Sequence, residues 1–385
     1  MFGNRVEWSG EENPLTDAVN QRRKIGGIIY DLIETNPTAA GFVYDEAAIM
    51  EAFANPAALR YEPTARGLLC AREAVSRYYA ERGWSMPADR ILLTASTSEA
   101  YALLFKLLAK PGYEVLYPTP GYPLVEFLAQ FEGLVAVRYR LTFSQNAQTW
   151  RIDFDRLAAA ISVRTRALVV ISPSNPTGNY LHAEDYDLLE ELAAEHGFAL
   201  IVDEVFYDFP AAGATRTREP RRKALTFVLN GLSKVCGLPQ MKLGWVAVYG
   251  PLHLVYDALA RLEYIADFYL SAGAPVQHAA GALLNTRHDL QRQINARLTT
   301  NDTFLRELCT QYPQHITLLP REGGWCSLIR CDDGLYGDMR SHRWLKYNGV
   351  LTHPAYYYDL RDDGLTVLSL LTPPDTFMKL GVVFE

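Results

Sequence analysis

Eight residues that could contact a ligand come soon after short apolar runs of the chain. The runs are residues 91–93, 114–117, 167–171, 198–202 and 226–229. The residues that follow them are Ser96, Thr97, Ser98, Tyr122, Asn175, Asp203, Ser233 and Lys234. If the runs are strands of one largely parallel sheet, these side chains meet at its carboxyl edge, where open α/β sheets bind ligands. Hydroxyls, an amide, a carboxylate, an aromatic ring and an amine together suit a small, charged, planar ligand.

Each of these features also has a plainer interpretation when it is taken alone. Hydroxyls before a helix are more often N-caps than a phosphate site, an Asn-Pro-Thr-Gly segment is usually a turn, and a single lysine is usually a surface charge. Residues 96–98 nevertheless open a predicted helix, whose free N–H groups and dipole suit a phosphate. The order of the polar residues is the stronger signal, because 28 residues separate Asn175 from Asp203 and 31 separate Asp203 from Lys234.

The predicted strands alternate with helices that carry an apolar face. After residues 91–93, apolar side chains recur three and four positions apart, which is typical of an amphipathic helix packed on a sheet: Ala100, Leu103, Leu104, Leu107 and Leu108. Such alternation predicts an α/β fold with a mostly parallel sheet covered by helices on both faces. Beyond about residue 275 the pattern changes to long helices and scattered strands. We therefore expect a large domain of residues 41–274 and a small α+β domain of residues 1–40 and 275–385.

Length and composition exclude several classes of protein. A chain of 385 residues exceeds what one hydrophobic core usually serves, and 49% hydrophobic with 21% charged residues is typical of globular proteins. A net charge of −7 with scattered basic residues argues against nucleic-acid binding. No apolar stretch approaches the roughly 20 residues that cross a bilayer. The first residues lack the pattern of a signal peptide, and five cysteines without a CxxC pair argue against a metal site and for a reducing cytoplasm.

Six segments resemble, in this order, the fold-type I pyridoxal-phosphate-dependent aminotransferases of the class I and II family. They are YEPTARGLLCAREAV, which begins at Tyr61, then TASTSEAY, PTPGY, SPSNPTG, VDEVFYDF and GLSKVCGLPQMKLGW. The resemblance implies a large domain with a mostly parallel sheet of the seven-stranded type between helices, and a smaller α+β domain. It also implies that pyridoxal 5′-phosphate is the cofactor.

The resemblance assigns roles to the residues at the predicted sheet edge. Lys234 resembles the lysine that holds the cofactor as an internal aldimine and then moves a proton between the substrate Cα and the cofactor. Asp203 resembles the carboxylate that keeps the pyridine nitrogen protonated, so that the ring accepts electrons. Asn175 would donate to the phenolate oxygen, and Tyr122 would stack on the ring.

The cofactor phosphate would be bound by groups from several loops. The resemblance places it on Ser96, Thr97, Ser98, Ser233 and Lys242. Tyr61 resembles the tyrosine that reaches the phosphate from a neighbouring subunit. A homodimer with shared active sites is therefore expected.

Three positions around the cofactor depart from the family pattern. The tyrosine expected three residues after the aspartate is Phe206, and Tyr207 would point to the other side if this segment is extended. Losing that hydrogen bond should raise the pKa of the internal aldimine. The serine expected three residues before the lysine is Gly231, and the arginine expected eight residues after it is Lys242, a point charge rather than a bidentate fork.

A fourth departure concerns the substrate. Val367 stands where the family has an arginine that binds the substrate α-carboxylate, and bidentate carboxylate recognition normally falls to arginine. Either another arginine (Arg330 and Arg361 are the nearest candidates) or backbone donors take this role, or the substrate is an unusual amine.

The function that the resemblance implies is transfer of an amino group from an amino acid to a 2-oxo acid, in two half-reactions through a pyridoxamine intermediate. A pyridoxal-phosphate β-lyase or decarboxylase would use the same lysine and aspartate, so the motifs leave that alternative open. A regulatory protein that only binds the cofactor is a third interpretation, given the missing arginine. The amino donor, the acceptor and the pathway do not follow from the sequence.

Overall fold

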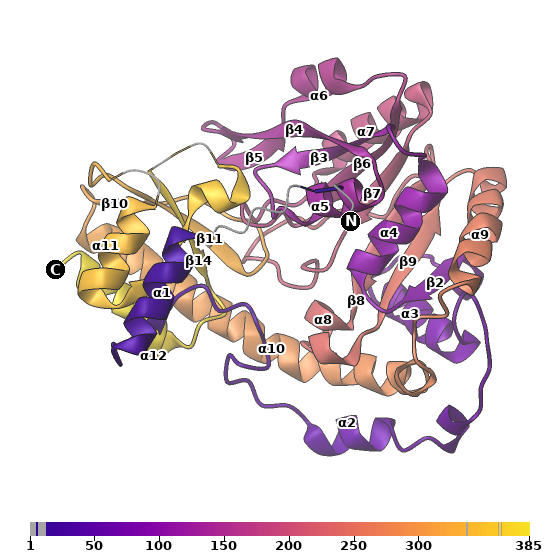
Figure 1. The fold of residues 1–385 in the computed structure, drawn as a ribbon, viewed down its shortest axis with the longest axis horizontal. Helices are drawn as coiled ribbons and strands as arrows, with labels where there is room; N and C mark the ends of the chain where they lie inside the picture. Colours follow the sequence, from indigo (N-terminus) through magenta and orange to yellow (C-terminus); the bar gives the residue numbers. More distant parts are fainter. Residues whose placement is uncertain (1–4, 7–12, 336–337, 361, 363) are drawn as a thin grey trace.

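A mixed sheet of eight strands forms the centre of the larger part of the molecule (Figure 1). The computed structural model describes residues 5–6, 13–335, 338–360, 362 and 364–385. The strand order is β2-β9-β8-β7-β6-β3-β4-β5. The strands are β2 (Ile91–Thr94), β3 (Glu114–Thr119), β4 (Val135–Ser144), β5 (Thr149–Ile152), β6 (Thr165–Ile171), β7 (Ala199–Asp203), β8 (Thr226–Gly231) and β9 (Gly244–Tyr249).

The sheet confirms the predicted fold class and carries one strand more than the seven-stranded type. β4, β3, β6, β7 and β8 are mutually parallel, whereas β9 runs antiparallel to both of its neighbours. The eighth strand arises because β4 is ten residues long and returns as a hairpin in β5, which pairs with its second half. Because β2 is in turn antiparallel to β9, it runs in the same direction as these five, and the six strands present their carboxyl ends at one edge.

Helices cover both faces of this sheet, as the apolar periodicity predicts. On one face α4 (Thr97–Leu108) packs beside α9 (Leu252–Asp267), with α5 (Leu124–Phe131) next to α4. On the other face lie α3 (Leu69–Glu81), α6 (Phe154–Ala160) and α7 (Ala183–His196). Successive residues of a strand point to opposite faces of the sheet. In β7, Ile201 therefore enters the core between the sheet and α4, whereas Leu200 and Val202 enter the core between the sheet and α3.

The smaller part of the molecule contains an antiparallel sheet of order β10-β11-β14-β13. Its strands are β10 (Ile316–Leu318), β11 (Cys326–Cys331), β13 (His353–Pro354) and β14 (Leu365–Ser369). α11 (Met339–Asn348) and α12 (Pro374–Phe377) accompany it, and β1 (Tyr30–Asp31) pairs with β12 (Val350–Leu351). α1 (Pro14–Lys24) packs on α11, so this N-terminal segment lies with the C-terminal elements.

One helix of 38 residues, α10 (Ala274–Gln311), joins the two parts (Figure 1). Its first third, which includes Val276 and Leu283, belongs to a core of the large sheet. Its later turns, which include Ile294 and Leu305, belong to the core of the small sheet. The helix thus serves both cores, and a domain boundary after residue 274 stays a prediction.

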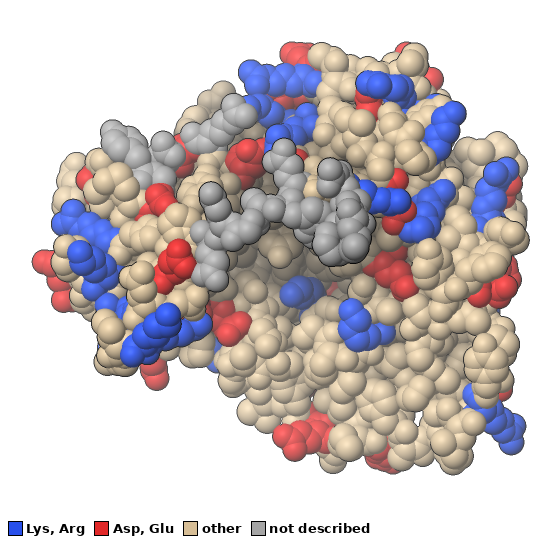
Figure 2. Space-filling model, viewed as in Figure 1, with Lys and Arg blue, Asp and Glu red and all other residues tan. Residues whose placement is uncertain are grey.

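Charged side chains are mixed over the surface. In Figure 2, lysine and arginine are interspersed with aspartate and glutamate across the visible face. Among the described helices, none is long and apolar enough to cross a bilayer.

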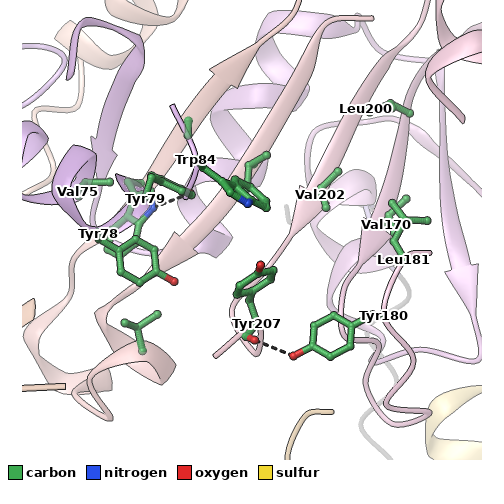
Figure 3. Close-up of a cluster of buried hydrophobic side chains, with 14 of the residues drawn as sticks. Val75, Tyr78, Tyr79, Trp84, Val170, Tyr180, Leu181, Leu200, Val202 and Tyr207 are labelled. Carbon is green, nitrogen blue, oxygen red and sulfur yellow. Dashed lines mark hydrogen bonds between the residues drawn. The ribbon is translucent and has the colours of Figure 1, made fainter. Parts of the chain in front are cut away.

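A buried ion pair joins Arg82 to Glu204, the residue that follows β7. Nη2 of Arg82 is 2.5 Å from Oε2 of Glu204, and the two side chains are 5% and 1% exposed. The guanidinium carbon of Arg82 lies 3.3 Å from the ring centroid of Tyr207 and 4.2 Å from that of Trp84. Figure 3 shows these two rings with Tyr78, Tyr79 and Tyr180, all in the core on the face of the sheet that α3 and α7 cover. Burial raises the pKa of Glu204 to about 7, although Arg82 opposes the shift.

An Arg82→Met variant is expected to lower the free energy of unfolding by about 3–5 kcal/mol, because Glu204 stays buried without its cation. The loss relative to the wild type should grow as the pH rises above about 7, because the folded wild type then ionises Glu204 beside Arg82, whereas the folded variant retains a proton that the unfolded chain has already released. Urea denaturation at pH 6 and pH 8 measures both effects. Arg261→Met is the control, because Arg261 pairs with Asp257 on the surface, where both side chains are more than half exposed. Equal losses in the two variants would contradict the prediction.

Candidate active site

The amine of Lys234 belongs to a partly buried side chain and has no polar partner among the described residues. Lys234 lies in α8 (Leu232–Val235), one turn after the end of β8. Its Nζ is 5.0 Å from the ring centroid of Trp325 and 5.7 Å from that of Phe206. No hydrogen bond or ion pair reaches this Nζ from the part of the chain that the structure describes. Burial lowers the pKa of Lys234, and the charge of Asp203 only partly opposes this. A lysine with a lowered pKa is a nucleophile and a base.

Asp203 ends β7 at the same edge of the sheet and is only 7% exposed. Its Oδ1 accepts a hydrogen bond from the N–H of Val205 at 3.1 Å, and its Oδ2 accepts one from the hydroxyl of Tyr101 at 3.0 Å. Burial raises the pKa of Asp203 to about 6, whereas the two donors and the charge of Lys234 lower it. The carboxylate is therefore buried, fixed at both oxygens and close enough to Lys234 for their charges to interact.

The loops after β3 and β6 meet beside these two residues. The N–H of Tyr122 donates to the carbonyl oxygen of Asn175 at 3.1 Å, so the two predicted site residues lie together. The ring of Tyr122 is about half exposed, at 52%. Sγ of Cys326 donates to Oδ1 of Asn175 at 3.3 Å. Burial raises the pKa of Cys326 to about 12, which keeps the thiol protonated and able to donate. The amide NH₂ of Asn175 is thereby directed away from Cys326.

The N-terminus of α4 supplies the predicted phosphate site. Ser96 is its N-cap, and its Oγ accepts from the N–H of Glu99 at 3.2 Å, so this hydroxyl has the plainer capping role as well. The N–H groups of Thr97 and Ser98 have no acceptor within the described ranges. Gly244 lets β9 approach this turn, because a Cβ there would lie 3.1 Å from the nitrogen of Thr97. Two free N–H groups at the start of a twelve-residue helix suit an anion.

The other predicted phosphate ligands differ in where they lie. Ser233 is next to Lys234 in α8, and Lys242 is exposed, two residues before Gly244. Tyr61 is 82% exposed and lines a separate cavity of about 260 Å³ with Leu270. In the single chain, Tyr61 is therefore not part of the residue cluster around Lys234.

The structure explains the departure at Phe206. The Phe206 ring packs edge-on against Trp325, with 5.2 Å between the centroids, and so forms part of the apolar wall near Lys234. Tyr207 does lie on the other side, where its hydroxyl donates to the carbonyl oxygen of Thr217 at 3.3 Å. The segment is a turn rather than the extended strand considered above, because β7 ends at Asp203.

The region of the missing arginine is apolar. Val367 of β14 lies opposite Leu328 of β11, and both side chains are buried. Arg330, one of the two arginines considered as replacements, is already paired with Asp362 at 2.7 Å and is 41% exposed. The other, Arg361, lies outside the described residues. Arg330 therefore offers no free guanidinium in place of the missing arginine.

The residues fit pyridoxal phosphate. Lys234 provides a partly buried amine without a polar partner in the described part of the chain, Asp203 a buried carboxylate and Asn175 an oriented amide. The half-exposed ring of Tyr122 and the free N–H groups of α4 add a stacking surface and an anion site. Sequence reasoning missed Tyr101 and Cys326, whose contacts span 102 and 151 residues of chain.

A family model described as aminotransferase class I and II matches residues 41–367. The chain belongs to this family. As an aminotransferase of fold type I, it is an enzyme that uses pyridoxal phosphate to move amino groups. It is 28% identical over 315 residues to the glutamate-pyruvate aminotransferase AlaA of Escherichia coli K12, covering 80% of this chain and 76% of that protein. It is 30% identical over 263 residues to an alanine aminotransferase of Mycobacterium tuberculosis H37Rv, covering 66% of this chain and 60% of that protein.

Solved aminotransferase structures share the fold along the whole chain. An alanine aminotransferase from Pyrococcus furiosus aligns with a TM-score of 0.86 at 23% identity, over 100% of this chain and 99% of that one. A mutant aspartate aminotransferase from Thermus thermophilus aligns with a TM-score of 0.84 at 24% identity, over 100% of this chain and 98% of that one. At these identities the likeness establishes the fold of this aminotransferase and not its substrates.

Proposed function

We propose that Lys234 and Asp203 are the catalytic residues with which this aminotransferase moves an amino group from an amino acid to a 2-oxo acid. The observation that carries the proposal is the partly buried amine of Lys234, which has a lowered pKa and no polar partner among the described residues, beside the buried carboxylate of Asp203. An ion pair that served only stability would place the two groups in contact. Here the amine of Lys234 instead lies near the aromatic rings of Trp325 and Phe206. Such an arrangement leaves the amine free for chemistry.

Pyridoxal phosphate, when bound, supplies an aldehyde that condenses with amines and a ring that accepts electrons from a broken Cα–H bond. Nζ of Lys234 would hold that aldehyde until the substrate amine displaces it. The freed Nζ would then take the proton from the substrate Cα and return it to the carbon that becomes the amine carrier. Phe206 and Trp325 keep water from Nζ, which maintains its lowered pKa.

The other residues would bind and orient the same molecule. A carboxylate oxygen of Asp203 would hold the proton on the ring nitrogen. Nδ2 of Asn175 would donate to the phenolate oxygen, because its Oδ1 is already bound by Cys326. The ring of Tyr122 would stack on the pyridine face.

The phosphate would sit at the start of α4. Its oxygens would accept from the free N–H groups of Thr97 and Ser98, with the Ser96 and Ser233 hydroxyls and the charge of Lys242 nearby. Lys242 contributes charge without the two parallel hydrogen bonds of an arginine. We therefore expect it to attract the phosphate more than it fixes the orientation of the phosphate.

We further propose a homodimer in the cytoplasm, in which Tyr61 reaches the phosphate of the other subunit. Exposed aromatic side chains support this, because large apolar groups gathered on a surface mark interaction sites: Tyr61 at 82%, Tyr264 at 70%, Phe268 at 73% and Tyr269 at 52% exposed. Tyr61 and Tyr269 line the same cavity. Five free cysteines fit a reducing compartment.

The substrates follow from the relatives only as a proposal. The names of those relatives point to glutamate and alanine as donors and to pyruvate as an acceptor, and we propose that this enzyme serves a biosynthetic process. Val367 itself offers no charge to the substrate carboxylate, so its recognition falls to another arginine or to backbone donors, unless the substrate is an unusual amine.

The test of the proposed function is a half-reaction without acceptor. Holoenzyme mixed with one amino acid at a time should release about one 2-oxo acid per active site and then stop, until pyruvate restarts it. Release of ammonia, or of CO₂, beyond one equivalent would replace transamination by lyase or decarboxylase chemistry. Transfer of ¹⁵N from glutamate to alanine confirms the complete reaction.

Cofactor affinity is expected to weaken as the pH falls below about 6. The unliganded Asp203 has a pKa of about 6, and only its ionised form pairs with a protonated ring nitrogen. Each pH unit below 6 should therefore raise the cofactor Kd about tenfold. Titration in a Lys234→Ala background removes covalent attachment from the measurement. Adding Asp203→Asn should flatten this part of the profile, and a profile unchanged by that substitution would assign the titration to another group.

A further inference from the structure

Both oxygens of Asp203 have a donor inside the protein, and one of these donors is a side chain. The N–H of Val205 belongs to the same turn and reaches Oδ1 at 3.1 Å. The hydroxyl of Tyr101 comes from a different element, α4, and reaches Oδ2 at 3.0 Å. The carboxylate of an aspartate otherwise rotates easily, because its terminal torsion has no sharp preference. Donors at both oxygens remove that freedom.

Tyr101 is placed to act on Asp203 and on little else. Its side chain is fully buried, and its ring packs near that of Phe105, with 5.9 Å between the centroids. Within the described ranges, Asp203 is the only hydrogen-bond partner of its hydroxyl. Burial and the charge of Asp203 raise the pKa of Tyr101 well above its usual value, so the hydroxyl stays protonated and remains a donor.

The position of Tyr101 on α4 links the two ends of the cofactor site. Thr97 and Ser98, whose free N–H groups form the anion site, lie one turn before Tyr101 on the same helix. α4 packs against α9 and β9 through Leu103 and Leu104, which are buried in the core of that face. A single rigid helix therefore fixes both the phosphate end and, through Tyr101, the carboxylate at the opposite end.

We propose that Tyr101 is a positioning residue that orients the Asp203 carboxylate and keeps it ionised for the ring nitrogen of the cofactor. The inference rests on the proposed role of Asp203. A hydrogen bond to the charged form of an acid favours that form, and burial of Asp203 works in the opposite direction. Tyr101 supplies this donor from a group that neither titrates near neutral pH nor adds a charge.

The test is Tyr101→Phe, which removes the hydroxyl and keeps the ring. In the Lys234→Ala background, where the charge of Lys234 no longer lowers the pKa of Asp203, the pH at which cofactor affinity falls should lie about one unit higher with Tyr101→Phe than with Tyr101 intact. The ¹⁵N resonance of a ring-labelled cofactor bound to Tyr101→Phe should shift toward the unprotonated value at pH 7.5. With Lys234 intact, kcat should fall about tenfold while KM changes little.

Tyr186→Phe is the matched control. Tyr186 is equally buried, but it lies in the core of the opposite sheet face and its hydroxyl has no hydrogen-bond partner among the residues that the structure describes. Its removal should leave the pH profile and the ¹⁵N resonance unchanged. A Tyr101→Phe protein that melts earlier but keeps the wild-type profile and resonance would reduce Tyr101 to a packing residue and overturn the inference. A wild-type protein without any adduct at Lys234 would instead overturn the proposed function, so the two failures are distinguishable.

Discussion

A Lys234→Ala variant is expected to lose amino-transfer activity by about 10⁴-fold or more while remaining folded. The substitution removes both the covalent attachment of the cofactor and the base that moves the Cα proton, and general acid–base catalysis alone contributes roughly 10²–10⁴-fold. Because Nζ has no polar partner among the described residues, its loss breaks no hydrogen bond or ion pair. Stability should therefore change little.

Three measurements separate this role from a structural one. Borohydride reduction followed by peptide mass spectrometry should locate a cofactor adduct at Lys234 in the wild type and none in the variant. Small primary amines added to the variant should restore part of the proton transfer. Lys223→Ala is the control, because Lys223 pairs with Glu191 at the surface and should keep full activity. A Lys234→Ala protein with wild-type turnover would remove this lysine from the mechanism.

Asp203→Asn should lower kcat by about 10²–10³-fold, the usual loss when one preorganised electrostatic group is removed from an active site. Asparagine keeps the size of the side chain and can still accept from Tyr101, but it has no charge to hold a proton on the ring nitrogen. The effect should appear in kcat rather than in KM, because the substrate does not contact this end of the cofactor.

The neighbouring carboxylate gives a sharp comparison. Glu204→Gln likewise replaces a carboxylate by an amide, at the next residue of the chain. Glu204, however, is buried in the protein interior, where it pairs with Arg82. That variant should lose stability in urea and keep most of its kcat under conditions where it is folded. Equal losses of kcat in the two variants would show that the position of Asp203 at the sheet edge is not what matters.

Local patterns in the sequence predicted most of the elements that form the site. The apolar run at residues 91–93 became β2, and the run at residues 198–202 became β7, shifted by one residue. Both are buried on their two faces, so a continuous apolar run identifies them. The β4–β5 hairpin was missed because β4 alternates buried residues with exposed ones such as Arg138 and Arg140, which weakens the apolar signal.

The contacts between the site residues could not be predicted in the same way. That Asp203 follows a strand can be read locally, but its bond to Tyr101 depends on how α4 rotates over the sheet. The bond between Cys326 and Asn175 depends on the register of β11 in the small sheet and on how that sheet meets the large one. Contacts of this kind between distant segments produce no periodic pattern in the sequence.

The unbroken course of α10 limits how the enzyme can respond to a substrate. Its first turns are anchored under the large sheet and its last turns under the small one. Strand β11, which begins at Cys326, and the preceding Trp325 can therefore shift toward Lys234 only if this helix tilts or bends along its length. Any closing movement then requires α10 to move. A small rotation of the helix near Ala274 displaces its far end, more than thirty residues away, by a larger distance.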